Sequence, residues 1–455
     1  MALPTSGATH RGAAGSDTTS MYNVLKTVYA SNEMYKVFNR NRIGLAKVAR
    51  RKQHVAEGLS FKYNVHTGGS SAGGMIGEGT ALPSIDTQKN AWQDFNMKTY
   101  AHQLKMTGQL IHSTEGKKAA MAAAWDFAAR TALQDAMDDF NVMLYRPANG
   151  LLTPIKSAPS TTTFTVENPR RLRVGQTISI GLRNDDTYHD ADLTDESVGT
   201  NGTAQAITAI SSSSMGATIT VGSALTGWTW TAATAAAGVD QFGNSVYGVY
   251  DDSVYDTTNG ALLGTFGLED MIAAYTFRHA DAATGTDYDF GGVDREAAGN
   301  AWSKGNIHNA NGGFIDHGVA DQAADLVSIS GPGEVKFWLG SPEMYREVKR
   351  LHIGDKRATM REQVGDGWFS TAELANRPFY PCKHCGLRDV YGIDNDYIWF
   401  AENKPLDWER RDGNWMHRQE SYWGYQALMT RMWQLCGIPS CHVRITNLNF
   451  EYYNA

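Results

Sequence analysis

The alternation of hydrophobic and polar residues is clearest in the first quarter of the chain. From Leu59 to Val65 every second residue is apolar, which is the period of a strand with one buried face. A glycine-rich segment follows at 68–79, and a second extended stretch runs through 92–110. Together they predict a long β-hairpin with a pliant tip. Because an isolated two-stranded hairpin is only marginally stable in water, we expect it to need a surface outside its own segment.

The strongest helix signal follows this hairpin. Ser113 or Thr114 can cap the helix start, and Glu115 suits the first turn. Apolar residues then recur every three or four positions, and Pro147 and Gly150 end the pattern. About thirty residues at ~1.5 Å each predict a helix roughly 45 Å long.

Residues 151–250 are rich in Thr, Ser, Gly, Ala and Val and poor in helix formers. Their pattern predicts an inserted β-rich module. Its short strands are expected at Thr163–Val166, Gln176–Ile180, Ala206–Ile210 and Ala217–Val221. An acidic stretch at 185–196 predicts a solvated surface loop. A calcium site is the alternative, although no twelve-residue helix–loop–helix pattern accompanies it.

Helices and strands alternate in the next 150 residues. Thr265 is expected to cap a helix that carries Leu268, Ile272 and Tyr275. Ser341-Pro342-Glu343 combines a cap, a proline and an early acid, and it follows a strand expected at 335–339. Another strand is expected at 397–400.

The final segment, 415–450, is rich in aromatic residues. Its apolar residues fit a strand and a helix almost equally well, so the pattern alone leaves both open.

Composition supports a folded protein of two or three compact units. The chain has 455 residues, of which 42% are hydrophobic and 20% are charged. No apolar run approaches the roughly 20 residues that span a bilayer, and the first twenty residues lack the apolar stretch of a signal peptide. We therefore expect a product of the cytoplasm with no membrane partner.

Charge is distributed unevenly along the chain. The formal net charge is −7, yet residues 1–56 contain nine basic and two acidic side chains. Arg50, Arg51 and Lys52 lie at the end of this basic leader. It is interpreted either as a solvated face or as an arm that meets acidic neighbours, a scaffold or packaged nucleic acid.

Short sequence strings match catalytic motifs, but the residues that the chemistry also requires are missing around them. Gly69-Ser70-Ser71-Ala72-Gly73 matches the nucleophile elbow, but the glycines that follow cannot form the helix that this chemistry needs. The same glycines lack the lysine of a phosphate-binding loop. The histidines are scattered, and no H-E-x-x-H string occurs. We expect no catalytic residue and no cofactor.

Four cysteines form two pairs along the chain. Cys382 and Cys385 enclose Lys383-His384, and Cys436 and Cys441 are followed by His442. Such spacing suits structural zinc if the two pairs meet in space. Disulfides and free thiols are the other two interpretations, and the sequence leaves all three open.

The order of these elements resembles the major capsid proteins of tailed bacteriophages, which have the Hong Kong 97-like fold. The resemblance rests on the hairpin with its Glu78-Gly79-Thr80-Ala81-Leu82-Pro83 tip, the run into the long helix, and Phe290-Gly291-Gly292-Val293-Asp294-Arg295 before Trp302. It implies an α+β fold, and it favours strands over a helix in the final segment. The implied units are an N-terminal arm (1–56), an extended loop (57–112), a spine helix of the peripheral domain (113–154), a β-rich insertion (155–250), an axial domain (251–400) and returning peripheral-domain strands (401–455).

The resemblance also implies a function. A structural protein of this kind assembles as hexamers and pentamers into an icosahedral head around double-stranded DNA, with a separate scaffold protein, a portal and in some cases a decoration protein. The contacts between subunits would then involve Gly68, Gly69, Gly73, Gly74, Gly77, Glu78, Arg50, Arg51 and Lys52. No lysine occurs between His66 and Asp86, so assembly without covalent cross-links is expected. The alternatives are a nanocompartment or gene-transfer shell of the same fold, and a zinc-stabilised β-rich binding protein or enzyme.

Overall fold

We analysed a computed structural model of the chain. The structure describes residues 43–49, 54–55, 60–68, 89–107, 118–148, 150–157, 162–182, 205–213, 216–222, 247–256, 261–272, 290–293, 295, 299–355, 360–364, 367–410, 417–418 and 424–450. The Ser113 and Thr114 caps, the 185–196 loop and Tyr275 lie outside these residues.

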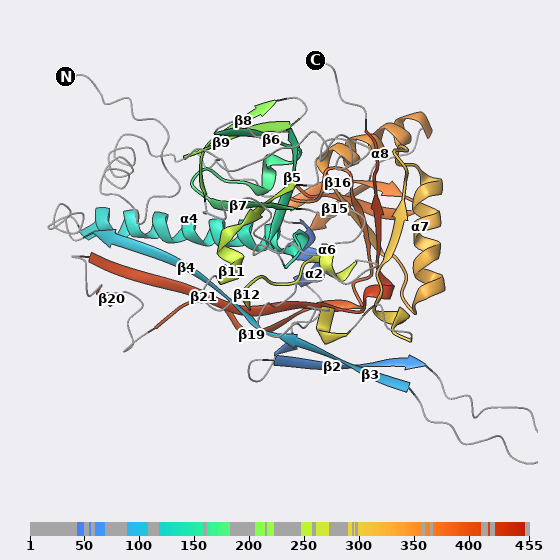
Figure 1. The fold of residues 1–455 in the computed structure, drawn as a ribbon, viewed down its shortest axis with the longest axis horizontal. Coiled ribbons are helices and arrows are strands. Elements are labelled where there is room, and N and C mark those ends of the chain that lie inside the picture. The colour runs from blue at the N-terminus through green and yellow to red at the C-terminus, as the bar shows by residue number, and fades with distance from the viewer. Residues whose placement is uncertain are drawn as a thin grey trace, which may run out of the picture.

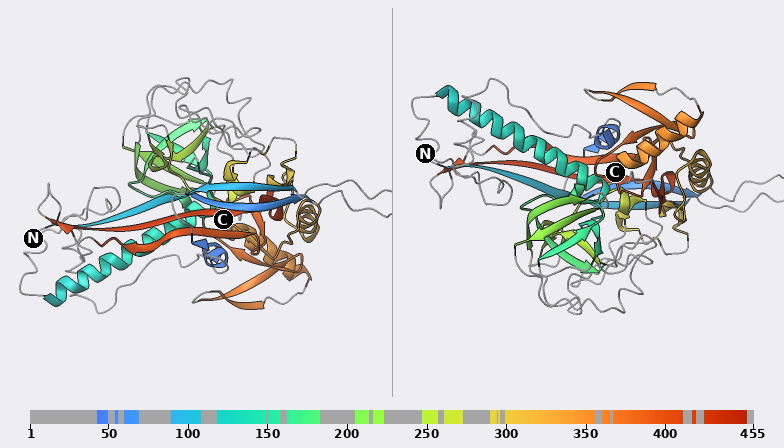
Figure 2. Two further views of the ribbon diagram at one scale, coloured as in Figure 1. Left: turned by 90° about the horizontal axis from the view of Figure 1, so that it is seen from below. Right: turned by 90° about the horizontal axis from the view of Figure 1, so that it is seen from above.

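A long helix lies along a sheet of long strands and extends from the body of the molecule (Figures 1 and 2). The helix α4 spans Lys118–Tyr145 and ends just before Pro147, as predicted. Strand β21 (Gly424–Gly437) pairs antiparallel with β19 (Ile398–Trp408) and with β4 (Lys98–Thr107). Two short strands complete the sheet, namely β20 (His417–Arg418) beside β21 and β1 (His54–Val55) parallel to β19.

The predicted hairpin is present but shorter than its pattern suggested. Strand β2 (Ser60–Gly68) pairs with β3 (Lys89–Asn96), and the register places Phe61 opposite Phe95. The second extended stretch then changes partner, because β4 leaves the hairpin and joins β21. The buried Met97 lies at this change of partner. A continuous run of apolar positions therefore belongs to two different sheets.

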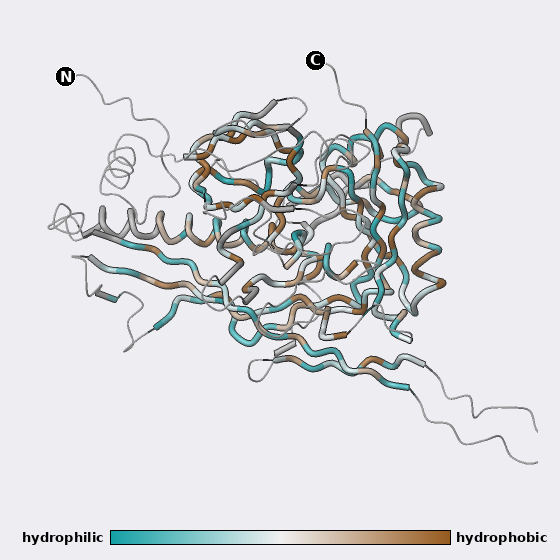
Figure 3. The backbone as a smooth tube through the Cα atoms, in the orientation of Figure 1, coloured by the Kyte–Doolittle hydropathy of each residue, from teal (hydrophilic) through white to brown (hydrophobic). Residues whose placement is uncertain are grey.

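The inserted module is a closed barrel of six strands that begins directly after α4. Its strands, in chain order, are β5 (Leu151–Ser157), β6 (Thr163–Val166), β7 (Thr177–Leu182), β8 (Gln205–Ser213), β9 (Gly216–Val221) and β10 (Tyr247–Asp251). All four strands predicted in this region are present. A core of its own fills the barrel, including Ile155, Phe164, Ile178, Ile219 and Val249. Hydrophobic positions recur along the barrel strands among more polar ones (Figure 3).

The second large unit is a seven-stranded mixed sheet with two helices. Its order is β13 (Asn306–Asn309), β22 (Val443–Thr446), β18 (Val390–Ile393), β14 (Phe337–Gly340), β17 (Arg377–Pro381), β16 (Gly367–Leu374) and β15 (Met360–Val364). Helices α7 (His317–Ser330) and α8 (Pro342–Asp355) pack on it. The Ser341 hydroxyl accepts a hydrogen bond from the Met344 N–H at 3.2 Å, so the predicted cap is confirmed.

The chain end does not stay in one unit. We expected 401–455 to return as strands of one peripheral domain, and β21 does lie in the long sheet. Strand β22, however, pairs with β18 and β13 in the seven-stranded sheet. The 3-10 helix η5 (Pro439–Cys441) stands between β21 and β22. The alternation of apolar residues is the same on both sides of this turn, so the change of sheet was not visible in the sequence.

The cap predicted at Thr265 is wrong. Helix α6 spans Leu268–Met271, and its N-terminal cap is Gly267, whose N–H donates to Asp270 at 3.0 Å. Thr265 is buried, and its hydroxyl has no hydrogen-bond partner among the described residues.

Seven short elements complete the described fold. They are α2 (Ile43–Ala49), β11 (Tyr255–Asp256), β12 (Ala261–Leu262), η1 (Pro169–Arg171), η2 (Asp252–Val254), η3 (Phe290–Gly292) and η4 (Ala301–Ser303).

Candidate assembly elements and the joint between the units

The residues predicted to contact neighbouring subunits lie almost entirely outside the described part of the chain. Gly68 is the exception, at the end of β2 opposite Lys89. Those outside are Gly69, Gly73, Gly74, Gly77, Glu78, Arg50, Arg51 and Lys52. These contacts therefore stay predictions.

The segment around these basic residues is anchored to the body. Leu45 and Val48 of α2 are buried in the main core, and β1 pairs with β19. Within the arm expected at 1–56, the described C-terminal part therefore packs on its own chain.

The base of the hairpin is likewise anchored by aromatic contacts. The ring of Phe95 lies 5.1 Å from that of Phe290, and the ring of Tyr63 lies 4.8 Å from that of Trp399, both edge to face. Edge-to-face pairs of this kind stabilise beyond the area they bury. The surface that the hairpin was expected to need outside its own segment is therefore supplied, at its base, by the same chain.

The Phe-Gly-Gly-Val-Asp-Arg string is the seat of this hairpin base. Gly291 has φ 67°, and a Cβ atom there would lie 2.9 Å from Cζ of Phe95 and 3.0 Å from Cβ of Gln93. Only glycine allows both this backbone conformation and this approach. Arg295 is buried with its guanidinium 5.3 Å from the Phe290 ring centre, and it donates to the Met271 carbonyl. This string is one of the motifs that carry the resemblance, and its physical role is to support the hairpin base.

The opposite face of the hairpin is exposed. Trp92, opposite Asn64 in the register, leaves 63% of its surface exposed. The ion pair between Lys62 and Asp94, at 3.2 Å, lies next to it in the register on the same face. An exposed tryptophan of this size is typical of a binding surface. The sequence showed the alternation in this strand but not which face the body covers.

Sequence reasoning missed the joint that fixes the barrel to the rest of the molecule. Between β6 and β7 three arginines reach three different elements. Arg170 donates to Glu343 of α8 at 2.8 Å, Arg171 donates to Glu269 of α6 at 2.9 Å, and Arg173 pairs with Asp139 of α4. We call residues 167–173 the clamp. The three contacts join the barrel to α4, α6 and α8.

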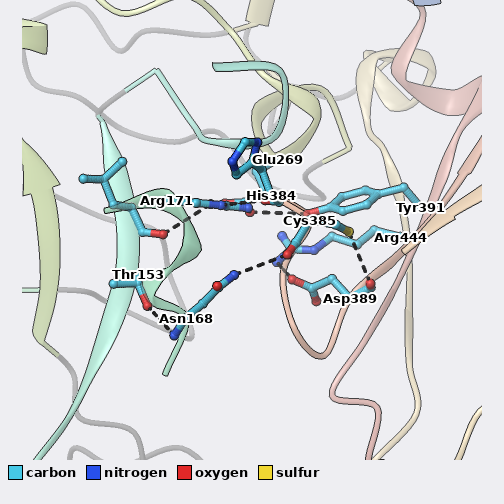
Figure 4. A network of polar contacts seen from close by, with 10 residues as sticks. Thr153, Asn168, Arg171, Glu269, His384, Cys385, Asp389, Tyr391 and Arg444 are labelled. Atoms are coloured by element: carbon cyan, nitrogen blue, oxygen red, sulfur yellow. Dashed lines mark hydrogen bonds and ion pairs between the residues drawn. The ribbon is translucent and has the colours of Figure 1, made fainter. Parts of the chain in front are cut away.

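Further hydrogen bonds from the clamp reach backbone carbonyl groups at 384–385, and Figure 4 shows how Asn168 and Arg171 point toward this segment. Arg171 also donates to the His384 carbonyl at 2.8 Å, and the Asn168 amide donates to the Cys385 carbonyl at 3.3 Å. On the same side, Arg388 donates to Glu167 at 2.7 Å. A visible signal for this joint was the run Asn168-Pro169-Arg170-Arg171, which a bare surface turn does not need.

Burial shifts the pKa values of several side chains in this joint, and a neighbouring arginine opposes the shift at Glu343. Burial alone would raise the pKa of Glu343, but the hydrogen bonds and charge of Arg170 outweigh it and hold this pKa below its usual value. Burial raises the pKa of Asp139 despite Arg173. For Asp270 burial raises the pKa to about 7, although the Gly267 and Ala148 N–H groups donate to this carboxyl. Burial lowers the pKa of His384 to about 3, so its ring is neutral and accepts from Asn141 at 2.8 Å.

A cleft of about 380 Å³ lies between β4, α4 and the barrel. Tyr100, Asp139, Arg146 and Asp251 line it. Tyr100 donates to Asp139 at 2.7 Å, and Arg146 pairs with Asp251. These side chains therefore bind one another across the cleft, and the cleft belongs to the joint between barrel and helix.

The four cysteines are free and buried. Cys382, Cys385 and Cys436 lie in the main core, whereas Cys441 packs with Val65 and Ile438 in a separate small cluster. Burial raises the thiol pKa of Cys385 and Cys436, and that of Cys441 to about 12. Within the described residues no three His, Cys, Asp or Glu side chains gather as a metal site, so the four cysteines of the zinc interpretation are not brought together as a ligand set.

Two further observations bear on the sequence predictions. The Gly69–Gly73 string lies outside the described residues. Among the helices that the structure describes, none combines the length and the apolar character of a membrane span.

Comparison with known proteins gives structural similarity alone. No family profile matches the chain, and no curated protein matches it in sequence. The capsid of Cyanophage A-1(L) matches over 92% of this chain and 96% of its own, with a TM-score of 0.51 and 11% identity. The capsid of a native GTA particle and the SrpI encapsulin of Synechococcus elongatus PCC 7942 match over 92% and 95% of this chain. Their TM-scores are 0.43 and 0.41, their identities 10% and 8%, and 94% and 98% of those chains are covered.

The fold is therefore that of a phage major capsid protein. The first of these similarities carries this conclusion, because its coverage is nearly complete for both chains. The prediction of an α+β, Hong Kong 97-like capsid fold is confirmed at the level of the fold.

Proposed function

We propose that this chain is a structural subunit of a capsid shell and not an enzyme. The observation that carries the proposal is the hairpin. Its base is fixed to the body by Phe95 and Tyr63, while its outer face exposes Trp92 and its strands lead away from the body (Figure 1). A lone chain gains little from this outer face, because most of Trp92 stays in solvent. In a shell, the outer face of the hairpin of each copy would contact a neighbouring subunit.

The finer proposal is a phage head. The subunits form hexamers and pentamers that close around double-stranded DNA, with help from a scaffold protein, a portal and, on some shells, a decoration protein. Many modest contacts repeated over a closed array supply the stability. The basic leader around Arg50 supports contact with acidic neighbours or nucleic acid.

The test is electron microscopy and sedimentation of the full-length chain, expressed alone and with a scaffold protein encoded beside it. We expect closed shells of megadalton mass. A chain that sediments as a folded monomer under both conditions contradicts the proposal.

The alternative shells of the same fold are separated by content. Purified particles that contain double-stranded DNA of phage length support the phage head, and particles with short DNA fragments support a gene-transfer shell. Particles that hold protein cargo and no DNA support a nanocompartment. A monomer with stoichiometric zinc would favour the β-rich binding protein or enzyme.

A further inference from the structure

Two helices on one face of the seven-stranded sheet differ in the charge they present to solvent. Helix α7 packs on β13 and β22, and α8 packs on β14, β16 and β17. Both contribute to one core, with Val327 from α7 and Val348 from α8. They therefore occupy two parts of the same layer, with α7 at its outer side (Figures 1 and 2).

The outward face of α7 is acidic. Asp321 and Asp325 are exposed and lie one turn apart, and the helix contains no lysine or arginine. Neither carboxylate forms an ion pair with any residue that the structure describes. Two like charges at this spacing repel each other and destabilise the helix slightly. A cation from outside the helix would remove that cost.

The outward face of α8 is basic. Arg346 and Arg350 leave 62% and 46% of their side chains exposed, whereas the carboxylates of Glu343 and Glu347 leave only 10% and 12%. Glu343 and Glu347 turn inward, whereas the two guanidinium groups turn outward. Each arginine contacts its neighbouring glutamate, and a guanidinium group carries five N–H donors in all.

We propose that α7 of one copy lies against α8 of the next copy in a ring, with Asp321 and Asp325 facing Arg346 and Arg350. This inference rests on the proposed function and adds the pair of surfaces that join neighbours. A ring of identical subunits needs two different surfaces that fit each other, and opposite charge on two helices of one layer provides them. Ile329, 82% exposed at the end of α7, adds an apolar contact to the same surface.

The test is charge reversal in the full-length chain. One variant combines Asp321→Lys and Asp325→Lys, a second combines Arg346→Glu and Arg350→Glu, and a third carries all four changes. Each half-variant places like charges opposite each other in every contact, so we expect its assembled fraction to fall at least about tenfold. The four-fold variant restores opposite charge and should assemble again. Sedimentation and electron microscopy measure the assembled fraction.

Circular dichroism and a urea melt of each half-variant verify folding, and Asp407→Lys, on β19, controls for a charge reversal at another exposed position. Half-variants that assemble like the natural chain overturn the proposed contact while leaving the shell function intact. Folded half-variants that fail, with no recovery in the four-fold variant, overturn the pairing of α7 with α8. Failure of the natural chain itself to assemble contradicts the proposed function instead.

Discussion

The barrel and the hairpin leave the body at different places and are secured in different ways. The barrel closes on itself, has its own core and is held by the charged clamp at 167–173. The hairpin has two strands, and aromatic rings and one close glycine contact support its base. A closed unit needs only orientation from its neighbours. The described part of the open ribbon has one covered face, with Phe95, and one face left largely in solvent, with Trp92.

The largest effect is expected where the clamp is most buried. In Arg171→Ala the carboxylate of Glu269 loses its cation inside the protein, and leaving a buried charge without its partner costs about 3–5 kcal/mol. Urea unfolding followed by tryptophan fluorescence measures this loss. The matched control is Arg346→Ala on the exposed face of α8, for which we expect less than about 1 kcal/mol. Equal losses in the two variants would mean that the clamp does not hold the barrel.

The next effect tests the seat of the hairpin. Gly291→Ala places a Cβ atom against Phe95 and Gln93 at a positive φ, so it should cost about 2–5 kcal/mol from strain and overpacking together. Gly299→Ala also has a positive φ but meets nothing within 4 Å, so only the strain of about 1–2 kcal/mol remains. Hydrogen exchange should rise in β2 and β3 of the first variant and not in the barrel. If hydrogen exchange rose equally in the hairpin strands and in the barrel, the result would contradict a local supporting role of Gly291 at the hairpin base.

A smaller effect concerns pH. The pKa of Asp270 is about 7 in the folded chain and near 4 when unfolded, so the folded state takes up a proton first as pH falls. This group therefore adds stability as pH falls from 7 to 4, and the gain is absent above pH 7. Asp270→Asn keeps an oxygen acceptor for the Ala148 and Gly267 N–H groups and should remove this part of the pH dependence. Urea melts at pH 5 and pH 8 compare the two chains. If the free energy of unfolding differed between pH 5 and pH 8 by the same amount in both chains, Asp270 would not be the source of this pH dependence.

The smallest effect on the single chain is expected on the outer face of the hairpin. Trp92→Ser removes a side chain that is mostly in solvent, so the free energy of unfolding should change by less than about 0.5 kcal/mol. The same change should lower the yield of assembled shells, because the large apolar side chain is lost from every contact. Phe95→Ser, on the covered face of the same strand, is the contrast, since it should destabilise the chain itself. Normal shell yield from Trp92→Ser would remove Trp92 from the assembly surface.

Several elements followed from local sequence. The period of apolar residues and the terminal Pro147 predict the spine helix, and short alternating runs predict four of the six barrel strands. The Ser341 cap is local too, because a side chain and a backbone group three residues apart decide it. In each case residues close in sequence supply both partners of the interaction.

Tertiary structure determined which strands pair with each other and which charged side chains meet. The alternating run at 92–107 is one pattern, yet β3 and β4 join different sheets, and β21 and β22 separate in the same way. The three arginines of the clamp meet carboxylates 34 to 173 residues away, at Asp139, Glu269 and Glu343, and no local spacing encodes such a meeting. The sequence determined which segments form helices and strands, because that depends on neighbours along the chain. Which faces are buried and which charges are paired depended on the packing of distant segments.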